Sequence, residues 1–277
     1  MSPSPPPSPE DDNDNLDASL FDDPEDFYPP TPPPTVQTHT LASTGQVLTL
    51  HLVGHSALEA HHLWNGSRVC ADFFEADPAS TVAGRTVLEI GAGAGLPSLA
   101  AAILGARKVV VTDFPDADLV ANLWKNVDEA GLLPEGEGQD EWESGRIVAD
   151  GFVWGADPEP LLKRLPEGKQ GKGFDVLILA DLLFRHSEHG KLADTIEQTM
   201  AKRKGSRAYV FFTSYRPWLQ HKDLNFFDIV RERGFVVEKI LERKMDRPLF
   251  ENDPGDEDVL KTVTGWAVTW PEDKCEE

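Results

Sequence analysis

Short apolar runs alternate with amphipathic stretches over most of the chain. Strand-like runs occupy residues 87–90, 108–112, 146–153, 174–180, 207–213, 236–242 and 265–270. Helical patterns at 96–104, 116–130, 187–204 and 222–234 separate most of them. Regular alternation of this kind is typical of an α/β fold with a mostly parallel sheet and helices on both faces. We therefore predict a Rossmann-like seven-strand sheet, with an antiparallel last pair and a ligand at the carboxyl ends of the strands.

The segments before residue 83 differ in character. Residues 36–41 and 46–53 alternate as in a hairpin, and a helical pattern runs from Ala57 to about Phe74, so residues 35–82 are predicted to form an N-terminal extension or lid. The first 34 residues contain nine acids between Glu10 and Asp26, many prolines and no Lys or Arg. Such a composition cannot bury a core, and residues 1–34 are predicted to be a disordered acidic tail.

A glycine-rich turn in the sequence VLEIGAGAGL, residues 87–96, carries the clearest chemical signal. Glycines at 91, 93 and 95 let the backbone approach a ligand, and the following helix start offers free amides. A dinucleotide fingerprint would place its third glycine where Leu96 stands, so NAD is disfavoured. Glu89 adds a carboxylate that would repel a pyrophosphate and tolerate a cation such as S-adenosylmethionine. The alternative is a turn that binds nothing.

The next strand ends at Asp113, twenty residues beyond Gly93. At this offset an acid can reach the ribose hydroxyls of a bound adenosine. Taken alone, Asp113 would more often be a helix cap or a turn residue than a ligand of a ribose, because Pro115 and Asp116 follow it. The combination with the glycine turn favours the ribose role.

Charge and composition narrow the classes of partner. The formal charge of −22 argues against a nucleic-acid surface and favours a basic partner. No apolar run is long enough to cross a membrane, and residues 1–5 lack the features of a signal peptide. Cys70 and Cys275 form no disulfide or metal pattern. We expect a cytoplasmic monomer that contacts neither nucleic acid nor membrane.

Several further motifs carry a family resemblance that spans about residues 21–270. They are FDDPEDF (21–27), HLWN (62–65), TDFPDADL (112–119), GFVWG (151–155), DLLFRHSEH (181–189) and RPW (216–218). Together with the glycine turn, they resemble the seven-strand S-adenosylmethionine-dependent methyltransferases and, more narrowly, the fungal branch of methyltransferase family 16. The resemblance implies a class I methyltransferase domain over residues 35–277, with its Rossmann-like core at 83–271.

The resemblance also implies roles for single residues around the cofactor. Trp64 would lie against S-adenosylmethionine from the lid side, and the turn residues Gly91, Ala92 and Gly93 would face its methionine portion. Asp113 would hold the ribose, and Trp154 would flank the adenine. Without the resemblance, both tryptophans would more simply be core aromatics.

The strand ending at Ala180 leads to the place where acceptor and cofactor would meet. By resemblance, small Ala180 keeps the space open, Asp181 orients the accepting amine or the cofactor ammonium, and Phe184 walls the pocket. Asp181 could instead cap a helix. His186 and His189 lack a third ligand and are assigned to a polar rim, and because His61 and His62 invite the same caution, no metal is predicted.

The resemblance implies an activity: methylation of the N-terminal glycine and adjacent lysine of elongation factor 1-alpha. The charge of the acidic tail suits either recruitment of a basic N-terminus or a purely solubilising segment. Two alternatives stay open. One is a small pyridine acceptor such as nicotinamide, and the other is a non-catalytic protein that binds the cofactor.

Overall fold

The computed structural model describes residues 32–133, 145–169 and 172–276. Residues 33–277 form one compact unit, to which the account below is confined. The predicted acidic tail falls almost entirely on residues 1–31, outside the described part of the chain.

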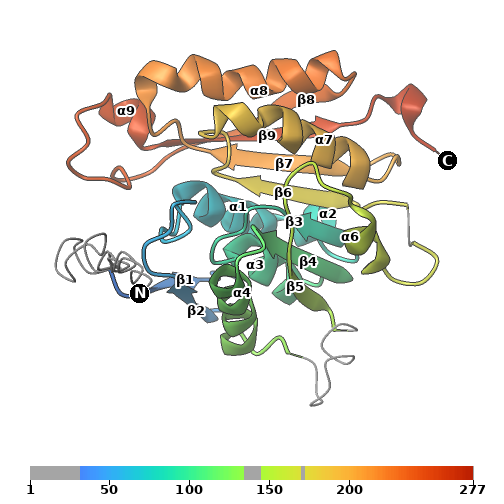
Figure 1. Cartoon of the computed structure of the whole chain (residues 1–277), viewed down its shortest axis with the longest axis horizontal. Coiled ribbons are helices and arrows are strands. Elements are labelled where there is room, and N and C mark those ends of the chain that lie inside the picture. The colour runs from blue at the N-terminus through green and yellow to red at the C-terminus, as the bar shows by residue number, and fades with distance from the viewer. Residues whose placement is uncertain (1–31, 134–144, 170–171, 277) are drawn as a thin grey trace, which may run out of the picture. The chain divides into compact units, whose positions relative to one another are not determined.

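Seven strands form the central sheet, in the order β5-β4-β3-β6-β7-β9-β8 (Figure 1). They are β3 (Thr86–Glu89), β4 (Lys108–Asp113), β5 (Ile147–Gly151), β6 (Val176–Ala180), β7 (Arg207–Phe212), β8 (Val236–Lys244) and β9 (Thr262–Thr269). Strands β3 to β7 pair in parallel, and β9 runs antiparallel to both β7 and β8. The predicted Rossmann-like sheet is confirmed, including its antiparallel last pair.

Helices cover both faces of this sheet. They are α1 (Asn65–Ala76), α2 (Pro78–Thr81), α3 (Leu96–Ile103), α4 (Ala117–Glu129), α6 (Glu159–Lys163), α7 (His189–Thr199), α8 (Gln220–Glu232) and α9 (Glu257–Leu260). Among these described helices, none combines the length and the apolarity needed to cross a bilayer.

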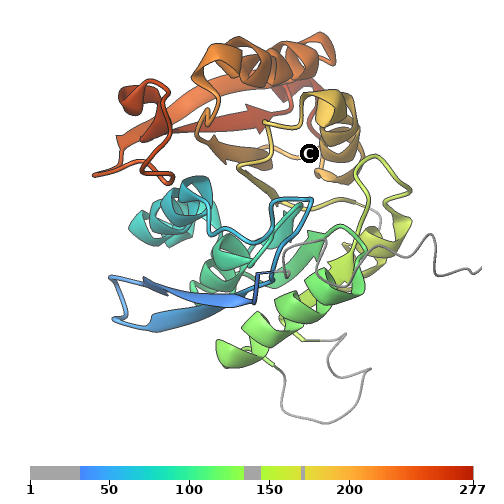
Figure 2. The ribbon, with the colours of Figure 1, turned by 60° about the vertical axis from the view of Figure 1, so that its left-hand side comes forward.

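The apolar core lies in two layers because strands β3, β4, β6 and β7 are apolar on both sides. In β4, Val109 and Val111 join the layer formed with α1, α3 and α4, whereas Val110 joins the layer formed with α7 and α8. A parallel strand buried on both faces is expected to read as such a continuous apolar run. Figure 2 shows the helices on the two sides of the sheet.

The strand order reverses between β3 and β6. From β3 the chain continues outward to β4 and β5, then returns so that β6 pairs with the other edge of β3. In an open α/β sheet, the ligand crevice lies at such a switch point, outside the carboxyl ends of the strands. The glycine turn follows directly after β3, and Asp181 follows directly after β6.

The N-terminal extension begins with a hairpin of β1 (Thr35–Thr40) and β2 (Val47–Leu52). Its second strand packs beside α4 (Figures 1 and 2), where Asn126 Nδ2 donates to His51 O and Asn126 Oδ1 accepts from His51 N. The helix predicted from Ala57 is shorter than expected and begins at Asn65. Glu59 has φ 63°, which an α-helix cannot contain, so residues 57–64 form turns instead.

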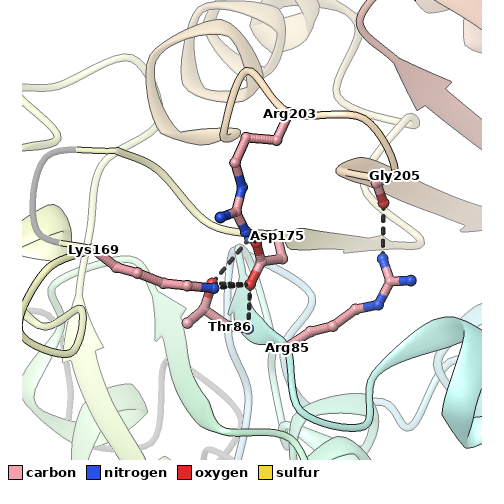
Figure 3. A network of polar contacts seen from close by, with 6 residues as sticks. All are labelled: Arg85, Thr86, Lys169, Asp175, Arg203 and Gly205. Atoms are coloured by element: carbon pink, nitrogen blue, oxygen red, sulfur yellow. Dashed lines mark hydrogen bonds and ion pairs between the residues drawn. The ribbon is translucent and has the colours of Figure 1, made fainter. Parts of the chain in front are cut away.

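At the amino-terminal end of β6, Asp175 joins segments that are far apart in the sequence (Figure 3). Its Oδ2 accepts hydrogen bonds from Lys169 Nζ at 2.7 Å and from Thr86 N at 2.9 Å, and its Oδ1 pairs with Arg203. Burial opposes ionisation of this carboxyl, but the bonds from Lys169 and Thr86 outweigh it and lower the pKa of Asp175 to about 2.

We expect Asp175→Asn to lower the free energy of unfolding by roughly 2 kcal/mol at pH 7, because the amide loses both ion pairs. The depressed pKa means that this stabilisation is present above about pH 4 and is lost as the pH falls toward 2. Urea unfolding at pH 7 and pH 2.5 measures it. Asp228→Asn, which removes an exposed pair with Arg231, should cost under about 0.5 kcal/mol at both pH values. An equal loss in the two variants would contradict the prediction.

Candidate active site

A cavity opens at the carboxyl ends of β3, β4 and β6. The segments that line it are 58–60, 62–64 and 67 before and within α1, 91–94 after β3, 113–114 after β4, 152–154 after β5, and 180–182, 184–185 and 188 after β6. Of the residues predicted from the sequence, these segments bring together Trp64, Gly91, Ala92, Gly93, Asp113, Trp154, Ala180, Asp181 and Phe184. The residues of the β1–β2 hairpin do not line it.

The glycine turn after β3 requires glycine for both conformation and space. Gly91 and Gly93 have φ of 65° and 57°, in the left-handed region. A Cβ on Gly91 would lie 2.7 Å from Leu182 Cδ2 and 3.0 Å from Trp154 Cζ2. The turn therefore forms a close-fitting floor, with the Trp154 ring beside it.

Asp113 ends β4 next to this turn. Its Oδ2 accepts a hydrogen bond from Gly93 N at 2.6 Å, and its Oδ1 accepts one from Phe114 N at 2.7 Å. Burial raises the pKa of Asp113, while these two bonds oppose the rise. Each oxygen keeps a second lone pair, so the carboxylate can still accept from ligand hydroxyls in the cavity.

The side chain of Glu89 lies elsewhere than the sequence predicts. Instead of facing a cationic ligand, the side chain is buried behind the turn, and it does not line the cavity. Its Oε2 accepts from Ser98 N at 3.0 Å in the first turn of α3, while Oε1 has no partner among the described residues. Burial raises the pKa of Glu89 to about 8. The prediction erred because the side chain at the end of β3 points toward the helix rather than out of the strand end.

Glu89→Gln should make the protein less sensitive to rising pH. Because the folded-state pKa lies above the usual value, the wild type loses stability as the pH rises from about 4.3 to about 8. Glutamine keeps an acceptor for Ser98 and cannot ionise. The stability of the variant relative to wild type should therefore rise by roughly 2–4 kcal/mol between pH 5 and pH 8. Urea unfolding at both pH values measures this, with exposed Glu238→Gln as the control. Parallel pH curves for wild type and Glu89→Gln would refute it.

Asp181 joins three parts of the fold at the cavity wall. Its Oδ2 accepts from Gly66 N at 2.5 Å, its Oδ1 accepts from Thr213 N at 2.9 Å, and its backbone N donates to Phe211 O. The residue has φ 54°, in the left-handed region that few residues other than glycine adopt, although Asp does so more readily than most. Burial raises the pKa of Asp181 to about 7, against these hydrogen bonds. The carboxylate thus fixes the start of α1 to the ends of β6 and β7.

Aromatic rings form one wall of the cavity. Trp64 stacks with Phe184 at 5.9 Å between ring centroids and makes edge contacts with Tyr215 at 4.8 Å and Phe250 at 5.9 Å. The Trp64 Nε1 donates to Glu59 O, which fixes the indole in the preceding turns. Tyr215 and Phe250 were missed from the sequence, since both lie in loops without periodic pattern.

Three contacts hold the segment that carries Phe184. Arg216 donates to Phe184 O, His189 Nε2 lies 2.8 Å from Leu183 O, and His186 Nε2 lies 2.7 Å from a carboxylate oxygen of Asp223. The predicted rim position is wrong for His189, which is buried in α7. Burial lowers its pKa, so the ring is neutral at pH 7.

The lining suits a nucleoside that carries a positive charge. Asp113 offers acceptors for sugar hydroxyls, Trp154 offers an aromatic face, and the narrow glycine floor admits backbone contact. Indole rings and carboxylates also suit a sulfonium and an ammonium. The donor set therefore fits S-adenosylmethionine, and the fold and cavity define the class: an S-adenosylmethionine-dependent methyltransferase.

The family follows from comparison with known proteins. A family model described as lysine methyltransferase matches residues 46–233, which is more than half of the chain, and the chain belongs to this family. It is 63% identical over 255 residues to the protein N-terminal and lysine N-methyltransferase of Neurospora crassa, covering 92% of this chain and 88% of that protein. The corresponding protein of Gibberella zeae is 60% identical over 262 residues, with 92% and 96% covered.

A solved structure supports the fold. A protein of Streptococcus mutans assigned as an S-adenosylmethionine-dependent methyltransferase superposes with a TM-score of 0.54 at 12% identity. The match covers 87% of this chain and 57% of that one. At this identity the likeness concerns the fold alone.

Proposed function

We propose that this enzyme transfers methyl groups from S-adenosylmethionine to the N-terminal glycine and the adjacent lysine of elongation factor 1-alpha. Similarity over nearly the whole chain to proteins named for methylating protein N-termini and lysines carries the proposal. The motif resemblance supplies the particular substrate. With that substrate, the place of action would be the cytoplasm.

Each residue that lines the cavity on the cofactor side is assigned one part of S-adenosylmethionine. Asp113 holds the ribose hydroxyls, and Trp154 flanks the adenine. Gly91, Ala92 and Gly93 face the methionine portion. S-adenosylmethionine supplies the sulfonium methyl group, and the chain supplies its position.

We assign the remaining lining residues to the space around the acceptor amine. Ala180 leaves room at the end of β6, and Trp64 and Phe184 close the space with their stacked rings, which exclude water. Methyl transfer is an in-line attack by a neutral amine, so holding the two reactants in line supplies most of the catalysis.

The acceptor amine must first lose a proton. With reference pKa values of about 7.7–8.0 for an α-amine and about 10.4 for lysine, this step costs about 1 and about 4–5 kcal/mol at pH 7. Asp181 lines the cavity with a pKa of about 7, a value suited to a general base at neutral pH. We propose that it assists proton removal or orients the amine through the lone pair that the backbone bonds from Gly66, Ser67 and Thr213 leave available.

The test is incubation of the purified full chain with labelled S-adenosylmethionine and an extract of cells that lack the enzyme, followed by mass spectrometry of labelled bands. Label on the N-terminal peptide of elongation factor 1-alpha is expected. Label confined to small molecules would replace the proposal with a nicotinamide-type activity. Cofactor binding without any transfer would favour a non-catalytic protein, and label on another protein would reassign the substrate.

A further inference from the structure

The turns between β2 and α1 bring three potential metal ligands together at the cavity wall. Glu59 Oε2 lies 3.9 Å from His61 Nε2 and 4.0 Å from His62 Nε2. One ligand atom from each residue can be chosen so that all three lie within 4.8 Å of one another. The three side chains are 45%, 23% and 31% exposed, so an ion can reach them from solvent. No third ligand for His61 and His62 was evident from the sequence, and the structure supplies one in Glu59.

Two imidazoles and one carboxylate are a donor set that suits zinc with an open fourth position. Bonds of about 2.0–2.1 Å in tetrahedral geometry place ligand atoms about 3.3 Å apart. The two separations from Glu59 exceed that by less than 1 Å, and all three ligand atoms lie within 4.8 Å of one another, so rotations of these partly exposed side chains can bring them together. We propose that Glu59, His61 and His62 bind a divalent transition-metal ion of the zinc class at the rim of the methyltransferase cavity.

The surrounding contacts hold the site together before an ion binds. Glu59 is fixed through its carbonyl, which accepts from Trp64 Nε1 at 3.0 Å. The His62 ring packs edge-on against Trp64 at 5.4 Å and against Phe250 at 5.1 Å. His61 lies 4.0 Å from His62 between ring centroids. These contacts restrict the Glu59 backbone and the His62 ring, so only small side-chain rotations are fixed on binding, which favours affinity.

Ion binding requires a proton to move within His61. At present Ser56 N donates to His61 Nδ1 in a long bond of 3.4 Å, which places the ring proton of neutral His61 on Nε2. Ligation through Nε2 moves that proton to Nδ1 and gives up the Ser56 bond. The cost is small because the bond is long.

Metal binding should be coupled to cofactor binding. Glu59 and His62 line the same cavity as Trp64 and Asp113. A divalent ion on one carboxylate leaves a net positive charge at the rim, which opposes the positive charge of S-adenosylmethionine. The demethylated product has lost the sulfonium charge. Zinc should therefore weaken binding of S-adenosylmethionine more than binding of S-adenosylhomocysteine, and by linkage the cofactor weakens zinc binding equally.

Isothermal titration of the full chain, without a polyhistidine tag, with zinc chloride at pH 7.4 tests the site itself. We expect one ion per chain with a Kd below about 100 µM. His62→Ala and Glu59→Gln should each weaken it at least about tenfold. Exposed His221→Ala is the matched control, since it removes a histidine of α8 outside the site, and it should bind as wild type does.

The outcomes separate this site from the proposed function. No binding up to 1 mM zinc, or unchanged affinity in both site variants, would overturn the site, whatever substrate the enzyme methylates. Should a variant fail to fold in a thermal melt, Co²⁺ on the wild type decides instead: tetrahedral absorption bands support the site, and octahedral or absent bands refute it. Equal effects of zinc on the Kd of S-adenosylmethionine and S-adenosylhomocysteine would refute the electrostatic coupling.

Discussion

Asp113→Ala is expected to weaken the binding of S-adenosylmethionine about 100-fold. A hydrogen bond to a charged group contributes about 1.5–3 kcal/mol, and the carboxylate at the end of β4 faces the cavity with lone pairs for two sugar hydroxyls. The substitution also releases Gly93 N, which Asp113 now holds at 2.6 Å, so the glycine turn loses a restraint. Both effects act in the same direction.

Isothermal titration of the purified variant measures this loss. Asp118→Ala is the control, because Asp118 is an exposed acid in the first turn of α4 and changes the charge equally. Asp113→Asn keeps the size and one acceptor, and its Kd should lie between those of wild type and Asp113→Ala. Wild-type affinity in Asp113→Ala would exclude the ribose role.

Asp181→Asn is expected to lower kcat by about 100-fold or more on both amines, and further on lysine than on the α-amine. The two oxygens of Asp181 meet backbone N–H donors from Gly66, Ser67 and Thr213. An amide offers one acceptor and turns an NH2 group toward the other donor, so the start of α1 must move. Lysine depends more on a base because its deprotonation costs more.

A second variant tests the positioning of α1 without touching the carboxylate. A Cβ on Gly66 would overlap Asp181 Oδ2 and lie 2.7 Å from Phe211 O, so Gly66→Ala should also lose most activity. Gly190→Ala is the matched control, since no atom lies within 4 Å of a Cβ there. A pH profile separates the roles: loss of a rate limb near pH 7 in Asp181→Asn, which Gly66→Ala retains, identifies a base. Wild-type kcat in Asp181→Asn on both amines would exclude either role.

The sheet and the cofactor side of the cavity follow from local sequence signals. Buried parallel strands such as β4 appear in the sequence as continuous apolar runs. A glycine turn after one strand and Asp113 at the end of the next lie side by side when the two strands pair in parallel. Residues at the ends of β3, β4 and β6 were therefore brought together as predicted. The orientation of Glu89 was not predictable in this way, because it depends on which side of a short strand the helix packs.

The part of the cavity assigned to the methyl acceptor could not be predicted in the same way, because contacts between distant loops form it. Tyr215 and Phe250 reach Trp64 from segments with no periodicity, and the groups that donate to the Asp181 carboxylate are backbone N–H groups, which leave no trace in the sequence. The start of α1 was placed too early because helical propensity does not report the left-handed backbone of Glu59. His189 was misassigned because the burial of a single histidine depends on the neighbouring helix.

The bond between Gly66 N and Asp181 joins residues 115 positions apart, and Asn65 meets Tyr215 across 150 positions. During synthesis at about 5–20 residues per second, the start of α1 therefore waits about 6–30 s for its partners to be made. Truncated chains that end before β7 would contain the lining residues of the cavity but lack Thr213 and Tyr215, which hold Asp181 and the start of α1 in place. The nascent enzyme should consequently acquire its acceptor site last, after the glycine turn and Asp113 have already formed the cofactor half.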